Sequence, residues 1–216
     1  MDTLAQAVID GNAPVAKEQT EQGLESGLPP ATILQEGLMA GMQVVGDRFK
    51  RNEFYVPEVL LAARAMKTAM EVLRPHLVAA DVEPVARIAI ATVKGDLHDI
   101  GKNLVGMMME GAGFEVIDLG VDASPDQFVE AVREQKAQVV GVSALLTTTM
   151  VNMRDVIEGL KDAGLRDQVK VLIGGAPVTE AFADEVGADG YAPDAATAVD
   201  VARDLLGLPA AATAPA

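Results

Sequence analysis

The segment RIAIATVKGDLHDIGKN, residues 87–103, decides the fold class of this chain. It opens on a near-continuous apolar run, as expected for a strand that is buried on both faces of a parallel sheet. The loop Gly95–Gly101 follows, and a helical segment rich in Gly and Met extends from about Lys102 to Gly111. A strand, a loop and a helix in this order predict a unit of an open α/β sheet, in which ligands bind at the carboxyl ends of the strands.

The same alternation of strand and helix continues toward the end of the chain. It predicts a doubly wound, parallel sheet of five strands, flavodoxin-like or Rossmann-like. The expected strands are 87–93, 114–119, 139–143, 169–173 and 190–192. The expected helices are 102–111, 125–136, 149–163, 179–186 and 195–206.

Ahead of Pro84 every strong hydrophobic period is helical, so the chain divides near residues 81–85. The four expected helices are a short one that ends at Asp10-Gly11-Asn12, one from Pro14 that ends around Gly23 to Gly27, one whose apolar stripe runs from Leu34 to Phe49, and one that begins at Pro57. Short connections between them predict an antiparallel four-helix bundle. We therefore expect a helical domain at 1–83, an α/β domain at 84–208 and disorder in the Ala/Pro-rich tail 209–216.

The composition excludes several classes of partner. A formal net charge of −15 is opposite to the basic surface that nucleic acid requires, and it also disfavours an anionic membrane. The chain opens on Met1-Asp2-Thr3 without the basic and apolar regions of a secretory signal, and no apolar run approaches the length of a membrane span. Together with the absence of cysteine, these features predict a cytoplasmic protein that binds neither nucleic acid nor membranes.

His98, one of two histidines among 216 residues, carries the clearest chemistry. Asp96 and Asp99 flank it, and a carboxylate that orients a neutral imidazole is the usual arrangement for a histidine that binds a metal. A bare zinc site would need three or four nitrogen or sulfur ligands, whereas a metal that arrives chelated in a macrocycle needs only one. The spacing alone leaves open a second interpretation, in which His98 is a solvated, hydrogen-bonded loop residue.

A phosphate-binding loop is a further interpretation of the same segment. Five residues rather than four separate Gly95 from Gly101, and Asn103 stands where a hydroxyl residue would hold magnesium. The two acidic residues inside the loop would also repel phosphates. We therefore discard this interpretation.

Two other expected strands end in residues that suit the same crevice. The hydroxyl-rich loop Ser143–Thr149 follows the third strand. Gly174-Gly175 follow the fourth strand, where the missing side chains would allow close approach of a flat ligand. Because the carboxyl ends of parallel strands meet at one edge of the sheet, we expect a long slot with His98 at its mouth.

The helical half of the chain also contains a cluster of interest. Three of the chain's seven aromatic residues, Phe49, Phe54 and Tyr55, lie within seven positions at the turn between the last two expected helices. Such side chains either close the end of the bundle or face a ligand, and the sequence leaves both interpretations open.

These motifs resemble the cobalamin-binding domain of methyltransferase corrinoid proteins and of cobalamin-dependent methionine synthase. Residues 95–103 match the extended form of the D-x-H-x-x-G signature of that family, and Ser143-x-Leu145 and Gly174-Gly175 match its other two motifs. The helical domain matches the cap that this subgroup carries ahead of the sheet. The resemblance covers residues 1–207.

The resemblance implies cobalamin bound base-off, with His98 in place of the cofactor's dimethylbenzimidazole as the lower axial ligand of cobalt. Asp96 would accept a hydrogen bond from the other ring nitrogen, and Thr149 stands where methionine synthase has a serine in the same relay. The nucleotide tail would lie in the slot, and aromatic residues of the cap would cover the upper, methyl-bearing face. The full set that the resemblance assigns to cofactor binding is Asp96, His98, Asp99, Ile100, Gly101, Ser143, Leu145, Thr147, Thr149, Gly174 and Gly175, with Phe49, Phe54 and Tyr55 of the helical domain.

The resemblance further implies a corrinoid protein of one-carbon metabolism, which cycles between methylcobalamin and the Co(I) corrinoid. Its partners would be a substrate-specific methyltransferase, an acceptor methyltransferase and a reductive activase. The chain has no modules for homocysteine or folate, so we expect a carrier subunit without catalytic residues. Methylamines, methanol, glycine betaine and methoxylated aromatics are donors in such systems. Two alternatives remain, the cobalamin-binding subunit of an adenosylcobalamin mutase and a cobalamin-responsive sensor.

Overall fold

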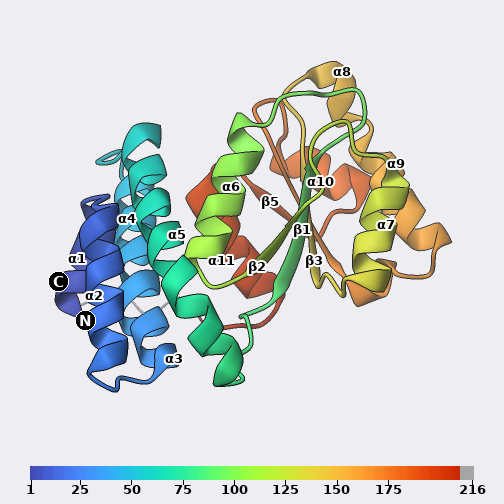
Figure 1. Cartoon of the computed structure of the whole chain (residues 1–216). Helices are drawn as coiled ribbons and strands as arrows, with labels where there is room; N and C mark the ends of the chain where they lie inside the picture. Colours follow the sequence, from blue (N-terminus) through green and yellow to red (C-terminus); the bar gives the residue numbers. More distant parts are fainter. Residues whose placement is uncertain (210–216) are drawn as a thin grey trace. The chain divides into compact units, whose positions relative to one another are not determined.

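The computed structural model of the chain describes residues 1–209 (Figure 1). The disorder predicted for 209–216 therefore lies, apart from Pro209, outside the described residues. The described chain divides into two compact units, one of residues 1–85 and 111–113, the other of residues 86–110 and 114–209. Within residues 1–209 no helix combines the length and the apolar character that a membrane span requires.

The α/β unit is built on a five-stranded, parallel sheet, which confirms the predicted fold class. Its strands are β1 (Arg87–Thr92), β2 (Glu115–Asp118), β3 (Val139–Ser143), β4 (Lys170–Gly174) and β5 (Gly190–Ala192). Their order, β2-β1-β3-β4-β5, is that of flavodoxin-like sheets. In this order the strand after β1 lies on one side of it and the following strands lie on the other, and such a switch point between β1 and β3 opens a crevice at the carboxyl ends of the two strands.

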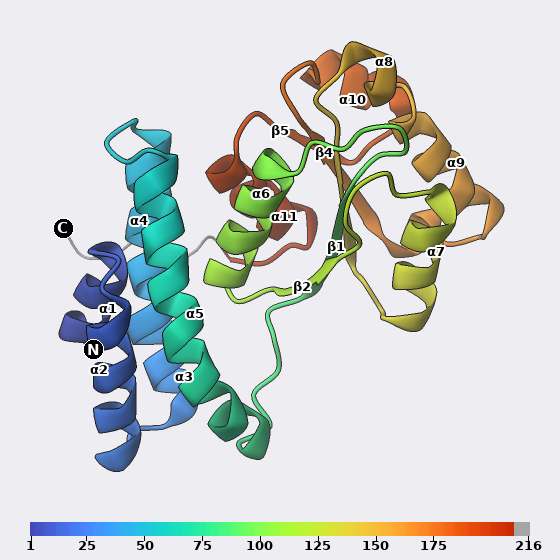
Figure 2. The same ribbon diagram turned by 45° about the horizontal axis from the view of Figure 1, so that its top comes forward.

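Helices cover both faces of the sheet (Figures 1 and 2). On one face lie α6 (Ile100–Gly111) and α11 (Ala195–Leu205), and on the other α7 (Pro125–Glu134), α9 (Met153–Asp162) and α10 (Glu180–Val186). The last three helices share one buried core with the sheet, to which they contribute Phe128, Ile157 and Val186. The inner strands β1, β3 and β4 are mostly buried, which explains their near-continuous apolar sequences, whereas the edge strands β2 and β5 are only partly buried.

The register of the sheet brings three strand ends level. Thr92 at the end of β1 is paired with Ser143 at the end of β3, and Ser143 is paired with Gly174 at the end of β4. The loops that leave these strands therefore begin side by side. This placement is what the sequence predicted for the loops that contain His98, the hydroxyl residues and the glycine pair.

One predicted helix differs in form, whereas the other elements of this unit end within two residues of their expected positions. The helix expected at 149–163 is two helices, α8 (Thr147–Met150) and α9, separated by Val151 and Asn152. The side-chain amide of Asn152 donates a hydrogen bond of 2.7 Å to the carbonyl oxygen of Lys94, just ahead of the His98 loop. Asparagine favours turns because its side chain competes for hydrogen bonds in this way.

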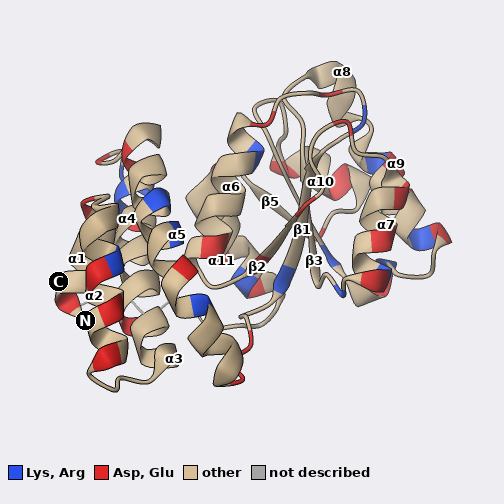
Figure 3. Cartoon of the chain, viewed as in Figure 1, with Lys and Arg blue, Asp and Glu red and all other residues tan. Residues whose placement is uncertain are grey.

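The helical unit contains four helical runs, as predicted. The first, second and fourth runs are α1 (Asp2–Ile9), α2 (Ala13–Glu25) and α5 (Val56–Ala79). The third run is continuous and consists of α3 (Pro30–Thr32), a π-helical stretch (Ile33–Met39) and α4 (Ala40–Lys50). The third run departs from a regular α-helix over the π-helical stretch, where it packs closely on α1. The close packing continues at the start of α4, where a Cβ at Gly41 would lie 2.8 Å from the carbonyl oxygen of Ala5, so the approach requires glycine. Acidic side chains lie on helices of both units (Figure 3), in keeping with the net charge of −15.

Candidate functional site

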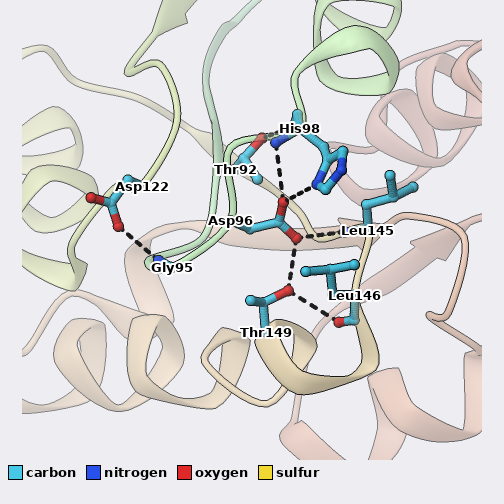
Figure 4. A network of polar contacts seen from close by, with 8 residues as sticks. All are labelled: Thr92, Gly95, Asp96, His98, Asp122, Leu145, Leu146 and Thr149. Atoms are coloured by element: carbon cyan, nitrogen blue, oxygen red, sulfur yellow. Dashed lines mark hydrogen bonds and ion pairs between the residues drawn. The ribbon is translucent and has the colours of Figure 1, made fainter.

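Asp96 is the centre of a polar network at the switch point of the sheet (Figure 4). Oδ1 of its buried carboxylate accepts hydrogen bonds from the ring Nδ1 of His98 at 2.7 Å and from the backbone N–H of His98 at 3.1 Å. Oδ2 accepts from the backbone N–H of Leu145 at 2.8 Å and from the hydroxyl of Thr149 at 2.7 Å. One carboxylate thus joins the loops that follow β1 and β3.

The ionised form of Asp96 is strongly favoured. Burial by itself would raise the pKa of this carboxyl, but the hydrogen bonds from the Leu145 amide, the Thr149 hydroxyl and the ring and amide of His98 hold the pKa well below its usual range. An ionised carboxylate can only accept hydrogen bonds, so Nδ1 of His98 carries the hydrogen between them. In the neutral imidazole the free lone pair then lies on Nε2.

The main chain of His98 is held as firmly as its ring. The buried hydroxyl of Thr92 donates a hydrogen bond of 2.7 Å to the carbonyl oxygen of His98. The side chain of His98 is nevertheless 52% exposed, and no hydrogen bond joins Nε2 to any residue in the described range 1–209. A nitrogen with a fixed lone pair on a half-exposed ring is able to bind a metal.

Thr149 completes a continuous chain of hydrogen bonds that begins at His98. It lies on α8, where its buried hydroxyl oxygen is 2.7 Å from Oδ2 of Asp96 and 3.1 Å from the carbonyl oxygen of Leu146. Its single hydrogen goes to the charged acceptor, which forms the stronger bond. His98, Asp96 and Thr149 are therefore linked in that order.

The second acidic neighbour of His98 has a different partner. Asp99 accepts a hydrogen bond of 3.1 Å from the side-chain amide of Asn103, one turn along α6. Its backbone carbonyl also accepts from the backbone N–H of Asn103 at 2.8 Å. Asp99 therefore supports the start of α6, and Asp96 alone orients the ring.

Exposed apolar side chains gather on the loops that carry this network. Leu97 and Ile100 flank His98 in the chain and are 73% and 77% exposed, and Leu145 and Leu146 after β3 are exposed as well. Ser143 beside them is half-buried, and Thr147 is exposed. Several apolar groups around one polar nitrogen suit a large ligand whose face is mostly apolar.

The glycine pair at the end of β4 is required by the packing of the chain itself. A Cβ at Gly175, where φ is +130°, would lie 1.9 Å from the carbonyl oxygen of Ala144, and a Cβ at Gly174 would lie 2.9 Å from that of Ala192. The space that a side chain at Gly175 would need is filled by the loop after β3, and contact of a flat ligand with this backbone stays a prediction. At Gly101, by contrast, a Cβ would meet nothing within 4 Å.

Lys102 has a structural partner, which agrees with the rejection of a phosphate-binding loop. Its buried Nζ lies 2.5 Å and 2.6 Å from the two carboxylate oxygens of Asp118, at the end of β2. The ion pair ties the first turn of α6 to the sheet. Lys102 therefore does not reach into the crevice.

Three polar residues that the sequence analysis did not single out also hold the His98 loop. Besides Thr92 and Asn152, the carboxylate of Asp122 accepts a hydrogen bond of 2.7 Å from the backbone N–H of Gly95. A threonine at the end of an apolar strand is a weak signal that the sequence offers for Thr92. Asp122 and Asn152 look like ordinary loop residues, and only their contacts distinguish them.

The aromatic cluster of the helical unit lies at the turn between α4 and α5. Phe49 and Phe54 are half-buried, and the guanidinium of Arg48 lies 5.1 Å from the centroid of the Phe54 ring. Tyr55 precedes α5 and is 63% exposed. Of the two interpretations left open by the sequence, closure of the bundle suits the two phenylalanines, whereas Tyr55 presents its ring outward.

The chemistry of the site fits a metal that is already chelated. Among residues 1–209 no group of three or more His, Cys, Asp or Glu side chains is placed to hold a metal ion. His98 would therefore act as a single nitrogen ligand, and the exposed apolar side chains around it would contact the chelating macrocycle. The residues present would suit a corrin whose metal takes Nε2 of His98 as a ligand.

We expect Asp96→Asn to lower the free energy of unfolding by about 1–3 kcal/mol at pH 7, because the amide group cannot accept all four hydrogen bonds. The difference in the free energy of unfolding between wild type and Asp96→Asn should be about 1 kcal/mol smaller near pH 3 than at pH 7. The pKa of Asp96 is lowered on folding from about 3.9, so the stability it contributes is complete above that value and lost as the pH falls below it.

Urea unfolding of both proteins at the two pH values measures the difference. Asp99→Asn, which changes an exposed carboxylate beside the same histidine, is the matched control. A loss that is as large near pH 3 as at pH 7 would contradict the expectation.

Comparisons with known proteins agree with this description. Two family models, each described as a B12 binding domain, match residues 86–200 and residues 1–74. Trimethylamine corrinoid protein 1 of Methanosarcina acetivorans is 43% identical over 202 residues, which cover 93% of this chain and 94% of that protein. Dimethylamine corrinoid protein 3 of the same organism is 44% identical over 209 residues, 95% and 98% of the two chains. A chain in the crystal structure of the methanol:cobalamin methyltransferase complex MtaBC from Methanosarcina barkeri matches 98% of this chain over 81% of its own length, with a TM-score of 0.85 at 27% identity.

Proposed function

Because the chain belongs to the family of corrinoid proteins with B12 binding domains, we propose that it carries a methyl group on cobalamin between a substrate-specific methyltransferase and an acceptor methyltransferase. The observation that carries the proposal is the half-exposed ring of His98, which the buried Asp96 orients through Nδ1 so that Nε2 is left for a ligand. Cobalamin supplies the cobalt atom to which the methyl group binds. The protein supplies the ligand, its orientation and the surfaces that partners recognise.

In this proposal His98 is the lower axial ligand of cobalt, and cobalamin is bound base-off. Asp96 fixes the tautomer and the orientation of the ring through the hydrogen bond at Nδ1, as carboxylates behind metal-binding histidines do. Thr149 and the amide of Leu145 fix the carboxylate from the side of β3.

The other predicted binding residues keep the roles that the resemblance implies. The corrin would rest on the exposed apolar side chains around His98. The nucleotide tail would follow the crevice past the ends of β1, β3 and β4, along Gly101, Ser143, Leu145, Thr147, Gly174 and Gly175. Asp99 and Ile100 would lie at its mouth. The chain would need no catalytic residue, because its partners activate donor and acceptor.

The methyl donor belongs to the methylamine and methanol group of substrates in this proposal. The relatives named for trimethylamine and for dimethylamine are 43% and 44% identical to this chain, so identity does not choose between these donors. The complex that contains a methanol:cobalamin methyltransferase supports a direct partner of the same class. A reductive activase and a cytoplasmic location stay predictions.

The proposal is tested by spectroscopy and by transfer. The protein is produced with ¹⁵N-labelled histidine, loaded with cobalamin and reduced to the Co(II) form. Electron paramagnetic resonance should show a triplet from a histidine nitrogen in unlabelled protein and a doublet in labelled protein, since the cofactor's own base is not labelled. A triplet in both proteins would place that base on the cobalt and contradict ligation by His98.

Methyl transfer is measured with a panel of methyltransferases for trimethylamine, dimethylamine, monomethylamine and methanol, each with its donor. We expect conversion of the reduced protein to its methylated form with one of them. Activity instead with adenosylcobalamin and a mutase subunit would favour the mutase alternative. Failure with every methyltransferase, together with a change of oligomeric state on cobalamin binding, would favour a sensor.

The exposed ring of Tyr55 leads to a prediction about the upper face of the cofactor. We expect the helical unit to cover this face, with Tyr55, Phe54 and Phe49 as the candidate contacts. Tyr55→Ala should then shorten the photolysis half-life of bound methylcobalamin several-fold, because solvent separates the radical pair more readily. Val78→Ala, which truncates an exposed apolar side chain at the end of α5, should leave the half-life unchanged. Equal half-lives for wild type, Tyr55→Ala and Val78→Ala would show that Tyr55 does not cover the methyl-bearing face of the cofactor.

A further inference from the structure

Asp122 makes a second set of contacts to the His98 loop, from the side opposite to Thr149 (Figure 4). It lies between β2 and α7. Its Oδ1 accepts a hydrogen bond of 2.7 Å from the backbone N–H of Gly95, and its own backbone N–H donates one of 3.0 Å to the carbonyl oxygen of Asp96. Asp122 therefore holds Asp96, the first residue of the D-x-H motif, and Gly95, the residue before it.

The backbone around Asp122 is shaped for these contacts. Its φ is 53°, in the left-handed region that few residues other than glycine adopt, and aspartate is among the exceptions. Glycine would adopt this conformation more readily but offers no carboxylate. Next to it, the backbone N–H of Ala123 donates a hydrogen bond of 3.0 Å to the carbonyl oxygen of Thr92, which extends the pairing of the chain with β1 beyond the end of β2.

Asp96 is consequently fixed from both sides of the switch point. The β2 side holds its main chain through Asp122, and the β3 side holds its carboxylate through Leu145 and Thr149. Hydrogen bonds weaken steeply with distance and angle. A shift of the Asp96 main chain would therefore lengthen the bonds of its carboxylate, including the one that orients His98.

We propose that Asp122 is a positioning residue, which sets the orientation of His98 toward cobalt by clamping Gly95 and Asp96. The inference rests on the proposed role of His98 as the cobalt ligand. It predicts that the carboxyl oxygen of Asp122 matters, rather than its charge. Asparagine retains that oxygen and tolerates the left-handed conformation, so it should substitute for aspartate, whereas glycine should not.

The experiment compares Asp122→Gly with Asp122→Asn in the full chain. In the Co(II) form loaded with cobalamin, Asp122→Gly should lower the ratio of histidine-bound to histidine-free cobalt about tenfold, at the lower end of the effect of losing an outer partner of a metal ligand. Asp122→Asn should retain the wild-type ratio. In the protein without cofactor, the Gly95 amide should exchange its hydrogen faster in Asp122→Gly alone.

Asp81 provides a matched control. It is an aspartate with a φ of 55°, at the end of α5, and its side chain forms no hydrogen bond within residues 1–209. Asp81→Gly should leave both the ratio and the exchange of the Gly95 amide unchanged.

The outcomes separate this inference from the proposed function. If wild-type protein shows no histidine nitrogen on cobalt, both fail. If wild-type protein shows it and Asp122→Gly shows it undiminished, only the role of Asp122 is overturned. Loss of the nitrogen signal in Asp122→Asn as well as in Asp122→Gly would also overturn it, since the oxygen is retained there. An unchanged thermal midpoint of Asp122→Gly without cofactor, combined with loss of the nitrogen signal, supports positioning over a general loss of stability.

Discussion

His98→Ala is expected to remove the histidine nitrogen signal from the Co(II) spectrum of the loaded protein. The reason is that His98 is the one side chain in the network that has a ring nitrogen without a hydrogen bond. The carboxylate of Asp96 and the hydroxyl of Thr149 are hydrogen-bonded to each other. The affinity for cobalamin should fall by more than the roughly 10–100-fold that follows loss of an outer partner of a metal ligand. Titration of the protein with cobalamin and the spectrum of the product measure the two effects.

His76→Ala is the control for this substitution. His76 is the other histidine of the chain and lies exposed on α5. The His76→Ala protein should bind cobalamin with wild-type affinity and keep the histidine nitrogen signal. A signal that survives in His98→Ala and disappears in His76→Ala would reassign the ligand.

Gly175→Ala is expected to lower the free energy of unfolding by about 3 kcal/mol or more, which combines backbone strain at a φ of +130° with overpacking. The added Cβ would lie 1.9 Å from the carbonyl oxygen of Ala144, so the loop after β3 has to move. That loop contains the Leu145 amide, which bonds to Asp96. We therefore expect the stability and the histidine nitrogen signal to fall together, measured by urea unfolding and by spectroscopy of the loaded protein.

Substitutions at two other glycines separate the contributions of backbone strain and of overpacking to this loss of stability. Gly164 has a φ of +68° and open space where a Cβ would lie, so Gly164→Ala should lose about 1–2 kcal/mol through strain alone. Gly101 is helical and also open, so Gly101→Ala should be neutral or slightly stabilising. If Gly175→Ala loses no more than Gly164→Ala, the clash with Ala144 is relieved at little cost and the packing argument is wrong.

Much of the fold follows from local sequence. Buried strands such as β1 and β3 are continuous apolar runs, and glycine and proline mark the ends of most helices, so both types of element were predicted closely. The sheet places the ends of β1 and β3 next to each other, which is why residues 50 positions apart could be assigned to one site. The break between α8 and α9 was missed because the hydrogen bond from Asn152 to Lys94 is a contact between distant segments.

At the site, too, contacts between distant segments limit what the sequence can predict. His98 and Asp96 are visible as a motif because two chemically distinctive residues stand close together in the sequence. Asp122 is hydrogen-bonded to Gly95, which lies 27 positions away in the sequence, and no residue pattern near Asp122 predicts that contact. Gly175 was noticed for its lack of a side chain, but only the structure identifies Ala144 as the group that fills the space.

The bonds that orient His98 all come from within the chain, through Asp96 to the ring and through Thr92 to the main chain. A ring held in this way loses little conformational entropy when it meets a metal, so it behaves as imidazole at a very high effective concentration. Free imidazole added to a chain that lacks this ring must supply that entropy itself. Chemical rescue of His98→Ala should therefore require imidazole in large excess over the protein. The imidazole concentration that restores the wild-type fraction of nitrogen-bound cobalt gives the effective concentration of the ring that Asp96 and Thr92 hold in place.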